Sequence, residues 1–158
     1  QKQNPSYIGC SNNFKDFDSF VEWCNREQGF MNTESNGRFW AIDKDLLKLG
    51  NYSEDSCLFV PSEVNSFIVD RANFRGNEKL GVLFYPNKNM YRARCSSQGK
   101  SNHLGYFETE DEAHQAWLNF KRKEAARLAE KYSIYTKMAN ALLTYYDDWP
   151  NMPDNGNK

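Results

Sequence analysis

The sequence has few of the residues that build a metal centre or a secreted scaffold. Of its 158 residues only two are histidines, His103 and His114, and its four cysteines stand singly with no Cys-x-x-Cys pair. A structural zinc site built from paired ligands is therefore excluded. The cysteines could form disulfides in principle, but no basic leader followed by an apolar stretch is present. We therefore predict a cytoplasmic protein whose thiols are reduced and buried.

Long apolar runs and the common catalytic loops are also missing. No run approaches the roughly 18–20 apolar residues that cross a membrane, and the mean hydropathy is -0.86, so no membrane partner is expected. The sequence contains no glycine-rich phosphate loop, no Gly-x-Ser-x-Gly and no His-Glu-x-x-His. Aromatic residues, at 15% of the chain, are abundant enough to supply a globular core.

Periodicity along the chain predicts an α+β protein whose first module, residues 1–75, is a small two-strand-and-helix (ββα) unit. The expected order is a helix capped by Asp16 or Asp18, two short strands, and a helix capped by Ser62. These elements are expected at residues 16–27, 39–42, 57–60 and 63–70. The polar stretch 71–79 is the expected boundary.

The second module, residues 79–131, is predicted to be three antiparallel strands followed by a long helix. The strands are expected at residues 80–85, 90–96 and 101–107. Loops of about four residues join them, which is typical of a meander. A C-terminal helix is expected within residues 132–150 and a disordered tail over 151–158.

The long helix is expected to begin at a capping box, Thr109-x-x-Glu112. Helical spacing places four small or aromatic residues on its buried face: Ala113, Ala116, Trp117 and Phe120. The basic run Lys121-Arg122-Lys123 is expected to be a solvated face. In the C-terminal helix, the expected buried residues are Ile134, Met138, Ala141, Leu142 and Tyr145.

Charge is distributed unevenly, although the formal net charge is only -1. Residues 1–75 hold 8 basic and 11 acidic side chains, residues 76–107 hold 5 and 1, and residues 108–158 hold 7 and 9. The net charges of the three segments are therefore -3, +4 and -2. A basic region between acidic flanks is the pattern of a protein that meets nucleic acid through one face.

The middle strand separates two kinds of side chain, because successive residues point to opposite faces of a sheet. One face carries side chains that a helix would cover: Tyr91, Ala93 and Cys95. The other carries two guanidinium groups and a hydroxyl: Arg92, Arg94 and Ser96. This second face is either a solvated surface or a DNA-binding one, since a sheet can enter the major groove, where arginine reads guanine.

The second module resembles the ethylene-response-factor (APETALA) DNA-binding domain over about residues 79–131. The resemblance rests on Gly81-Val82, Tyr91-Arg92-Ala93-Arg94 and the run from His103-Leu104-Gly105-Tyr106-Phe107 to Glu112-Ala113. It implies a three-stranded sheet, packed on one helix, that docks in the major groove of double-stranded DNA. Phage and bacterial proteins carry this domain, often behind a nuclease module, so the resemblance also implies a phage protein that acts in the cytoplasm of a bacterial host.

By position, the resemblance places DNA-facing side chains on all three strands and one loop: Leu83, Tyr85, Lys88, Arg92, Arg94, Ser96, Ser101 and His103. Four of these positions are mostly arginine in the plant members: Leu83, Tyr85, Ser96 and Ser101. The plant target sequence therefore does not carry over, and fewer phosphates are neutralised. We expect Arg92 and Arg94 to read or position bases and Lys88 to contact phosphate.

The first module is similar to the His-Asn-His (HNH) nuclease fold, in which two strands and a helix surround one divalent metal. In that family an Asp-His pair ends the first strand, and an Asn lies in the helix after the second strand. On that pattern Asp43 and Asn65 match the ligands of a Mg²⁺ ion, and Lys44 takes the place of the histidine base. The alternative is that Asp43, Lys44 and Asp45 form a turn with local hydrogen bonds.

Lysine is a poor substitute for the histidine base. A lysine amine is protonated at pH 7, so Lys44 would need its pKa lowered by several units, and no histidine occurs in residues 1–102. We therefore expect a degenerate nuclease module without a cofactor, followed by a double-stranded-DNA-binding domain. Two alternatives stay open: a metal-dependent homing-type endonuclease, and a phage inhibitor of a host defence or metabolic protein.

Overall fold

The computed structural model describes residues 10–68 and 78–147 and shows a mixed α+β protein with two compact units. Each unit is made of two stretches of chain. Within the described residues, the first unit comprises residues 10–68 and Tyr132–Leu142, and the second comprises residues 78–131 and 143–147.

This division differs from the expected one, because the C-terminal helix is shared between the two units and is not a separate element. The proposed tail 151–158 lies outside the described residues, as does the proposed boundary 71–79 apart from its last two positions.

The first unit contains two short antiparallel strands, and three helices contribute to it. Their bounds are α1 (Phe17–Arg26), β1 (Ala41–Asp43), β2 (Leu58–Val60), α2 (Ser62–Ile68) and α4 (Thr136–Thr144). Asp43 of β1 lies opposite Leu58 of β2. The expected strand at 39–42 begins later, because Phe39 forms a separate antiparallel bridge with Thr33.

The ends of α1 and α2 are capped in different ways. Asp16 caps α1 as predicted, and its carboxylate accepts a hydrogen bond from the Ser19 N–H at 2.8 Å. Ser62 was expected to cap α2 but is its first helical residue. The Ser62 N–H donates instead to the carboxylate of Glu34 at 2.7 Å, so a distant side chain satisfies this helix start.

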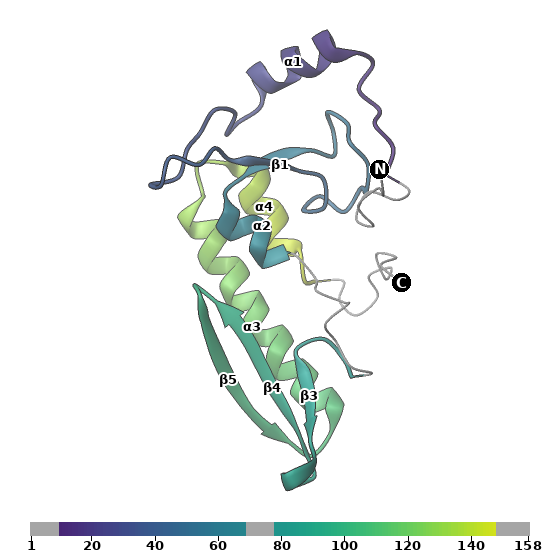
Figure 1. The fold of residues 1–158 in the computed structure, drawn as a ribbon, viewed down its shortest axis with the longest axis vertical. Helices are drawn as coiled ribbons and strands as arrows, with labels where there is room; N and C mark the ends of the chain where they lie inside the picture. Colours follow the sequence, from purple (N-terminus) through teal and green to yellow (C-terminus); the bar gives the residue numbers. More distant parts are fainter. Residues whose placement is uncertain (1–9, 69–77, 148–158) are drawn as a thin grey trace. The chain divides into compact units, whose positions relative to one another are not determined.

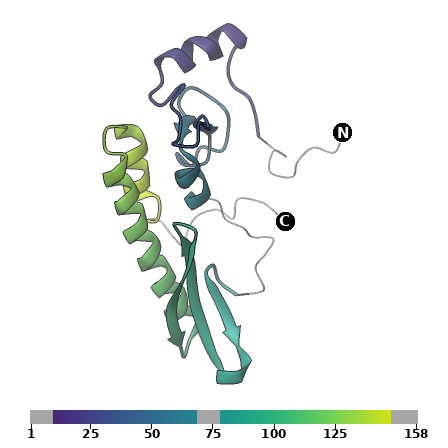
Figure 2. The ribbon, with the colours of Figure 1, turned by 60° about the vertical axis from the view of Figure 1, so that its left-hand side comes forward.

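The second unit confirms the prediction of a three-stranded antiparallel sheet packed against a helix. The strands are β3 (Val82–Tyr85), β4 (Met90–Ser97) and β5 (Lys100–Phe107), and the helix is α3 (Glu110–Lys131). The strand order is β3-β4-β5 (Figure 1). Helix α3 runs along one face of this sheet and leaves the opposite face uncovered by the helix (Figure 2).

The two loops of the sheet differ from each other. A short 3-10 turn, η3 (Pro86–Lys88), joins β3 to β4. The β4–β5 loop was expected to have about four residues but has only two, Gln98 and Gly99, whose φ angles are 51° and 71°. Positive φ at both positions is typical of the tight hairpin turn that matches the twist of its strands, which lets both strands extend further.

Helix α3 begins at the predicted capping box. The Glu112 N–H donates to the Thr109 hydroxyl at 3.2 Å, and the Thr109 N–H donates to the Glu112 carboxylate at 3.1 Å. The predicted buried stripe is only partly correct, since Ala116 and Phe120 are half-buried. The buried residues of α3 are Ala113, His114, Trp117, Leu118, Lys121, Ala125, Leu128 and Ala129.

Lys121 corrects the expectation that its basic run is wholly solvated. Its side chain is buried, and its ammonium lies 5.8 Å from the ring centroid of Trp117 and 5.3 Å from that of Tyr146. The aromatic rings cover the aliphatic stem and attract the charge.

The C-terminal helix is shorter than predicted. Tyr132–Tyr135 form a turn, closed by a hydrogen bond from the Tyr135 N–H to the Tyr132 carbonyl, and α4 begins only after it. Ile134 is therefore 74% exposed, whereas Met138 and Leu142 are buried as predicted. No helix within the described residues combines the length and the apolar character that a membrane span requires.

The cysteines are free thiols, and three are buried as predicted: Cys24, Cys57 and Cys95. Cys10 is half-buried. Burial raises the pKa of each of the three buried thiols, which disfavours the reactive thiolate.

Candidate nucleic-acid interface

The uncovered face of the β3–β4–β5 sheet carries the basic residues that the alternation predicted. Ala93 and Cys95 are buried on the α3 side, whereas Arg94 and Ser96 are exposed on the other side. Arg92 lies opposite Leu83 of β3, and Arg94 lies opposite His103 of β5. The pairing therefore brings side chains of all three strands onto one surface, which we call the sheet face.

An irregularity in β5 adds a residue that sequence reasoning missed. Simple alternation from His103 would turn Tyr106 toward the helix, but the register shifts beside Arg94, and Tyr106 pairs with Arg92. Gly105 adopts a φ of 136° at this shift, a conformation that glycine tolerates best. A glycine inside a strand was the available signal, because it often marks a bulge.

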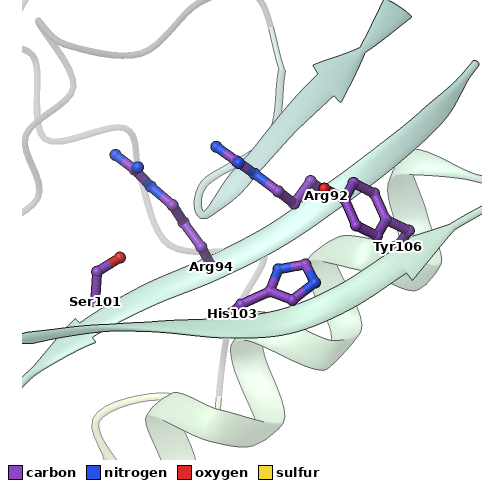
Figure 3. A pocket seen from close by; sticks show the side chains of 5 residues that line it. All are labelled: Arg92, Arg94, Ser101, His103 and Tyr106. Carbon is purple, nitrogen blue, oxygen red and sulfur yellow. The ribbon is translucent and has the colours of Figure 1, made fainter. Parts of the chain in front are cut away.

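Five side chains of the sheet face line a shallow hollow of about 180 Å³: Arg92, Arg94, Ser101, His103 and Tyr106. Figure 3 shows the guanidinium groups of Arg92 and Arg94 extending side by side from β4, with His103 and Tyr106 beside them on β5. The structure thus brings four predicted DNA-facing residues together and adds Tyr106. Ser96 lies opposite Ser101 on the same face but outside the lining of the hollow.

Aromatic rings hold the cations beside the hollow. The Lys88 ammonium lies 3.9 Å from the ring centroid of Tyr106, and the Arg92 guanidinium carbon lies 5.8 Å from that of Tyr85. The rings of Tyr85 and Tyr106 contact each other at 5.6 Å, and Tyr106 contacts His103 at 4.9 Å. These cation–π and ring contacts order side chains that would otherwise lose entropy on binding.

Within residues 10–68 and 78–147, no carboxylate neutralises the two arginines of the sheet face, since none forms an ion pair with Arg92 or Arg94. The Nε atom of Arg92 is buried without a hydrogen-bond partner in this part of the chain. An orphaned charged donor is costly, so the face is suited to a ligand that supplies acceptors and negative charge.

The beginning of β3 is fixed to α3 by close contacts. The Gly81 carbonyl accepts a hydrogen bond from the Arg94 N–H at 2.9 Å, and a Cβ atom added at Gly81 would lie 2.0 Å from the Trp117 ring. His114 stacks on Trp117 at 5.5 Å, and its Nδ1 lies 2.9 Å from the Leu80 carbonyl oxygen. The backbone of Arg94 is thus positioned by the packing on α3.

In the first unit, Asp43 occupies the position predicted for a metal ligand, but its carboxylate organises a turn. One oxygen accepts hydrogen bonds from the N–H groups of Asp45 at 3.0 Å and Leu46 at 2.8 Å. Burial raises the pKa of Asp43. This geometry matches the turn that the sequence offered as the alternative to metal binding.

Lys44, at the predicted base position, is held as an ammonium. Its Nζ donates to the Asp45 carboxylate at 2.6 Å. Burial acts to lower the pKa of Lys44, but the hydrogen bond and the charge of Asp45 outweigh it, and the pKa is raised. Both the pairing and the direction of the shift oppose a role as general base.

Asn65, the third residue of this predicted site, lies within α2 and is half-buried. Across residues 10–68 and 78–147, no group of three or more His, Cys, Asp or Glu side chains is placed to hold a metal ion.

Replacing Asp43 by alanine is expected to lower the free energy of unfolding by about 1–3 kcal/mol, because two backbone donors lose their acceptor. Asp43→Asn retains the acceptor oxygen and removes the charge that burial disfavours. This variant should therefore stay within about 1 kcal/mol of the parent. Urea unfolding at pH 7 measures the free energy of unfolding of both variants. Equal losses of unfolding free energy in the two variants would show that these hydrogen bonds are not the means by which Asp43 stabilises the fold.

Comparison of the chain with protein-family models, with curated proteins and with solved structures finds no match.

Proposed function

We propose that this protein binds double-stranded DNA through the sheet face. The observation that carries the proposal is the pair of adjacent guanidinium groups on β4, Arg92 and Arg94, neither of which has a carboxylate partner among the described residues. Such groups recognise phosphates and the guanine edge through bidentate hydrogen bonds. The resemblance of residues 79–131 to the ethylene-response-factor domain is in accord with this.

The mode of docking follows from the distribution of charge. A sheet of this kind inserts its open face into the major groove, where Arg92 and Arg94 reach bases or phosphates and Lys88 reaches the backbone. The segments that flank the sheet in sequence carry net charges of -3 and -2, which disfavour DNA elsewhere on the protein. Binding is therefore confined to one face.

For the first unit we propose a degenerate nuclease module of the HNH type that no longer cleaves DNA. The order β1, β2, α2 supports the assignment, and the paired ammonium of Lys44 argues against catalysis. The whole chain is then a phage protein that acts in the cytoplasm of a bacterial host. Nicking of plasmid DNA that requires Mg²⁺ and is lost in Asp43→Asn would contradict this part of the proposal.

The proposed function predicts a marked salt dependence of DNA binding. If the cations of the sheet face neutralise two or three phosphates, log K should fall against log salt concentration with a slope of about -2 to -3. Fluorescence anisotropy of a labelled duplex between about 50 and 300 mM NaCl measures this slope.

Two results would contradict the proposed function: no binding at about 50 mM NaCl, or binding whose affinity does not change with salt. Because the DNA site is unknown, a mixed-sequence duplex of about 30 base pairs serves first, since nonspecific contacts to phosphates do not depend on sequence. Unlabelled duplex is the competitor that separates binding of DNA from binding of the dye.

A further inference from the structure

We propose that the hollow of the sheet face binds one phosphate group, and that His103 donates to this phosphate as an imidazolium ion, so that binding takes up a proton. The proposal rests on the proposed function for the source of the phosphate, which is then one phosphodiester of the DNA backbone. It assigns Arg92 and His103 to the positioning of the DNA backbone.

The side chains around the hollow are mainly hydrogen-bond donors, so they suit a ligand that accepts hydrogen bonds. Arg92 and Arg94 supply guanidinium N–H groups, and Ser101 and Tyr106 supply hydroxyls. The Arg92 Nε is buried and unpartnered among the described residues, so its desolvation is offset only when an acceptor arrives. A phosphate offers anionic oxygens in the geometry that guanidinium groups bind best.

His103 stands among cations and hydroxyls. Arg94 lies directly opposite on β4, Tyr106 contacts its ring at 4.9 Å, and Arg92 shares the hollow. Two further residues contact the Tyr106 ring: Lys88 of η3, through its ammonium, and Tyr85 of β3, through its own ring. Among the residues that the structure describes, these charged and titratable neighbours include no carboxylate, so the phosphate is the anion that would favour the imidazolium ion.

Proton uptake fixes the direction of the pH effect. An imidazole ordinarily titrates near pH 6.5, and a bound anion shifts that titration upward. Affinity is then highest at low pH and falls as the pH rises through the titration of the bound form. The other histidine, His114, lies on α3 and is engaged with the Leu80 carbonyl and Trp117, so it does not line the hollow.

The first experiment tests the hollow without DNA. Inorganic phosphate is titrated into the full chain at pH 6, and the NMR signals of the Arg92 Nε–H and the His103 ring are followed. We expect saturable shifts at both residues and none with sodium chloride at the same ionic strength. Equal shifts with chloride, or no shift at either residue, would overturn the phosphate site whatever the outcome with DNA.

The second experiment measures duplex affinity between pH 6 and pH 8 at constant ionic strength. The parent should lose about fivefold in affinity, because the bound phosphate favours the protonated imidazole and this contribution is lost as the pH rises. His103→Gln should bind weakly with less than about twofold change, and His103→Arg should bind tightly throughout because its charge is fixed. Lys123→Ala removes an exposed charge from α3 and should keep the parental pH profile.

The two proposals fail in different ways. Duplex binding that is independent of pH in the parent, or an unchanged profile in His103→Gln, overturns the proton-coupled phosphate site and leaves DNA binding standing. Loss of all duplex binding overturns the proposed function, while the phosphate titration still decides whether the hollow is an anion site.

Discussion

The double replacement Arg92→Ala/Arg94→Ala is expected to weaken binding to duplex DNA by about 100-fold at 50 mM NaCl. Each well-placed arginine contact to a base or phosphate contributes about 1–3 kcal/mol, and the two side chains act at one surface. The loss should be large because no other guanidinium group lines the hollow in the described part of the chain. Anisotropy titration of the parent and the variant against one labelled duplex measures the difference.

A charge-matched control separates recognition from simple attraction. Lys15→Ala/Lys123→Ala removes the same amount of charge from exposed positions outside the sheet face. This control should lose less than about fivefold in affinity, since solvent largely screens exposed charges that make no direct contact with the DNA. Equal losses in the two double variants would mean that net charge, and not the sheet face, determines binding. Unchanged far-UV circular dichroism establishes that both variants are folded.

Replacing Gly81 by alanine is expected to destabilise the second unit by about 2–5 kcal/mol. The new Cβ would lie 2.0 Å from Trp117 Cδ1, and the φ of 75° disfavours any residue with a Cβ. Trp117 is only 5% exposed, so its ring has little room to move. Because the Gly81 carbonyl accepts the Arg94 N–H, the variant should also lose DNA affinity. Urea unfolding monitored by far-UV circular dichroism measures the loss of stability.

Gly99 provides the matched control for backbone strain. It has nearly the same φ, 71°, but an added Cβ meets nothing within 4 Å. Gly99→Ala should therefore cost only about 1–2 kcal/mol, which is the penalty of the left-handed conformation alone. If Gly81→Ala costs no more than Gly99→Ala, the contact with Trp117 does not hold β3 on the helix.

Local patterns in the sequence were sufficient to predict much of the second unit. The capping box of Thr109 and Glu112 and the strand alternation of Arg92 and Arg94 each depend on residues a few positions apart. Such short-range rules fix where elements begin and which face a side chain takes. The sheet, the helix and most of the candidate interface followed from them.

Features that depend on distant residues escaped sequence reasoning. Tyr106 joins the sheet face because β5 shifts register against β4, and the ammonium of the buried Lys121 lies 5.3 Å from the ring centroid of Tyr146, a residue outside α3. The start of α2 is capped by Glu34, which is 28 residues away. The choice between a turn and a metal ligand at Asp43 likewise depended on the position of the Leu46 N–H, which a residue pattern does not specify.

Because each unit is built from two stretches of chain, truncation cannot separate one unit from the other. The second unit is interrupted by Tyr132–Leu142, which pack with the first unit before the chain returns. A fragment ending at Lys131 would lose Tyr146 from beside Trp117 and Lys121 and leave that part of the second unit incomplete. No single cut therefore releases either unit intact. Replacing one contiguous segment of the chain by a foreign module would therefore disrupt both units.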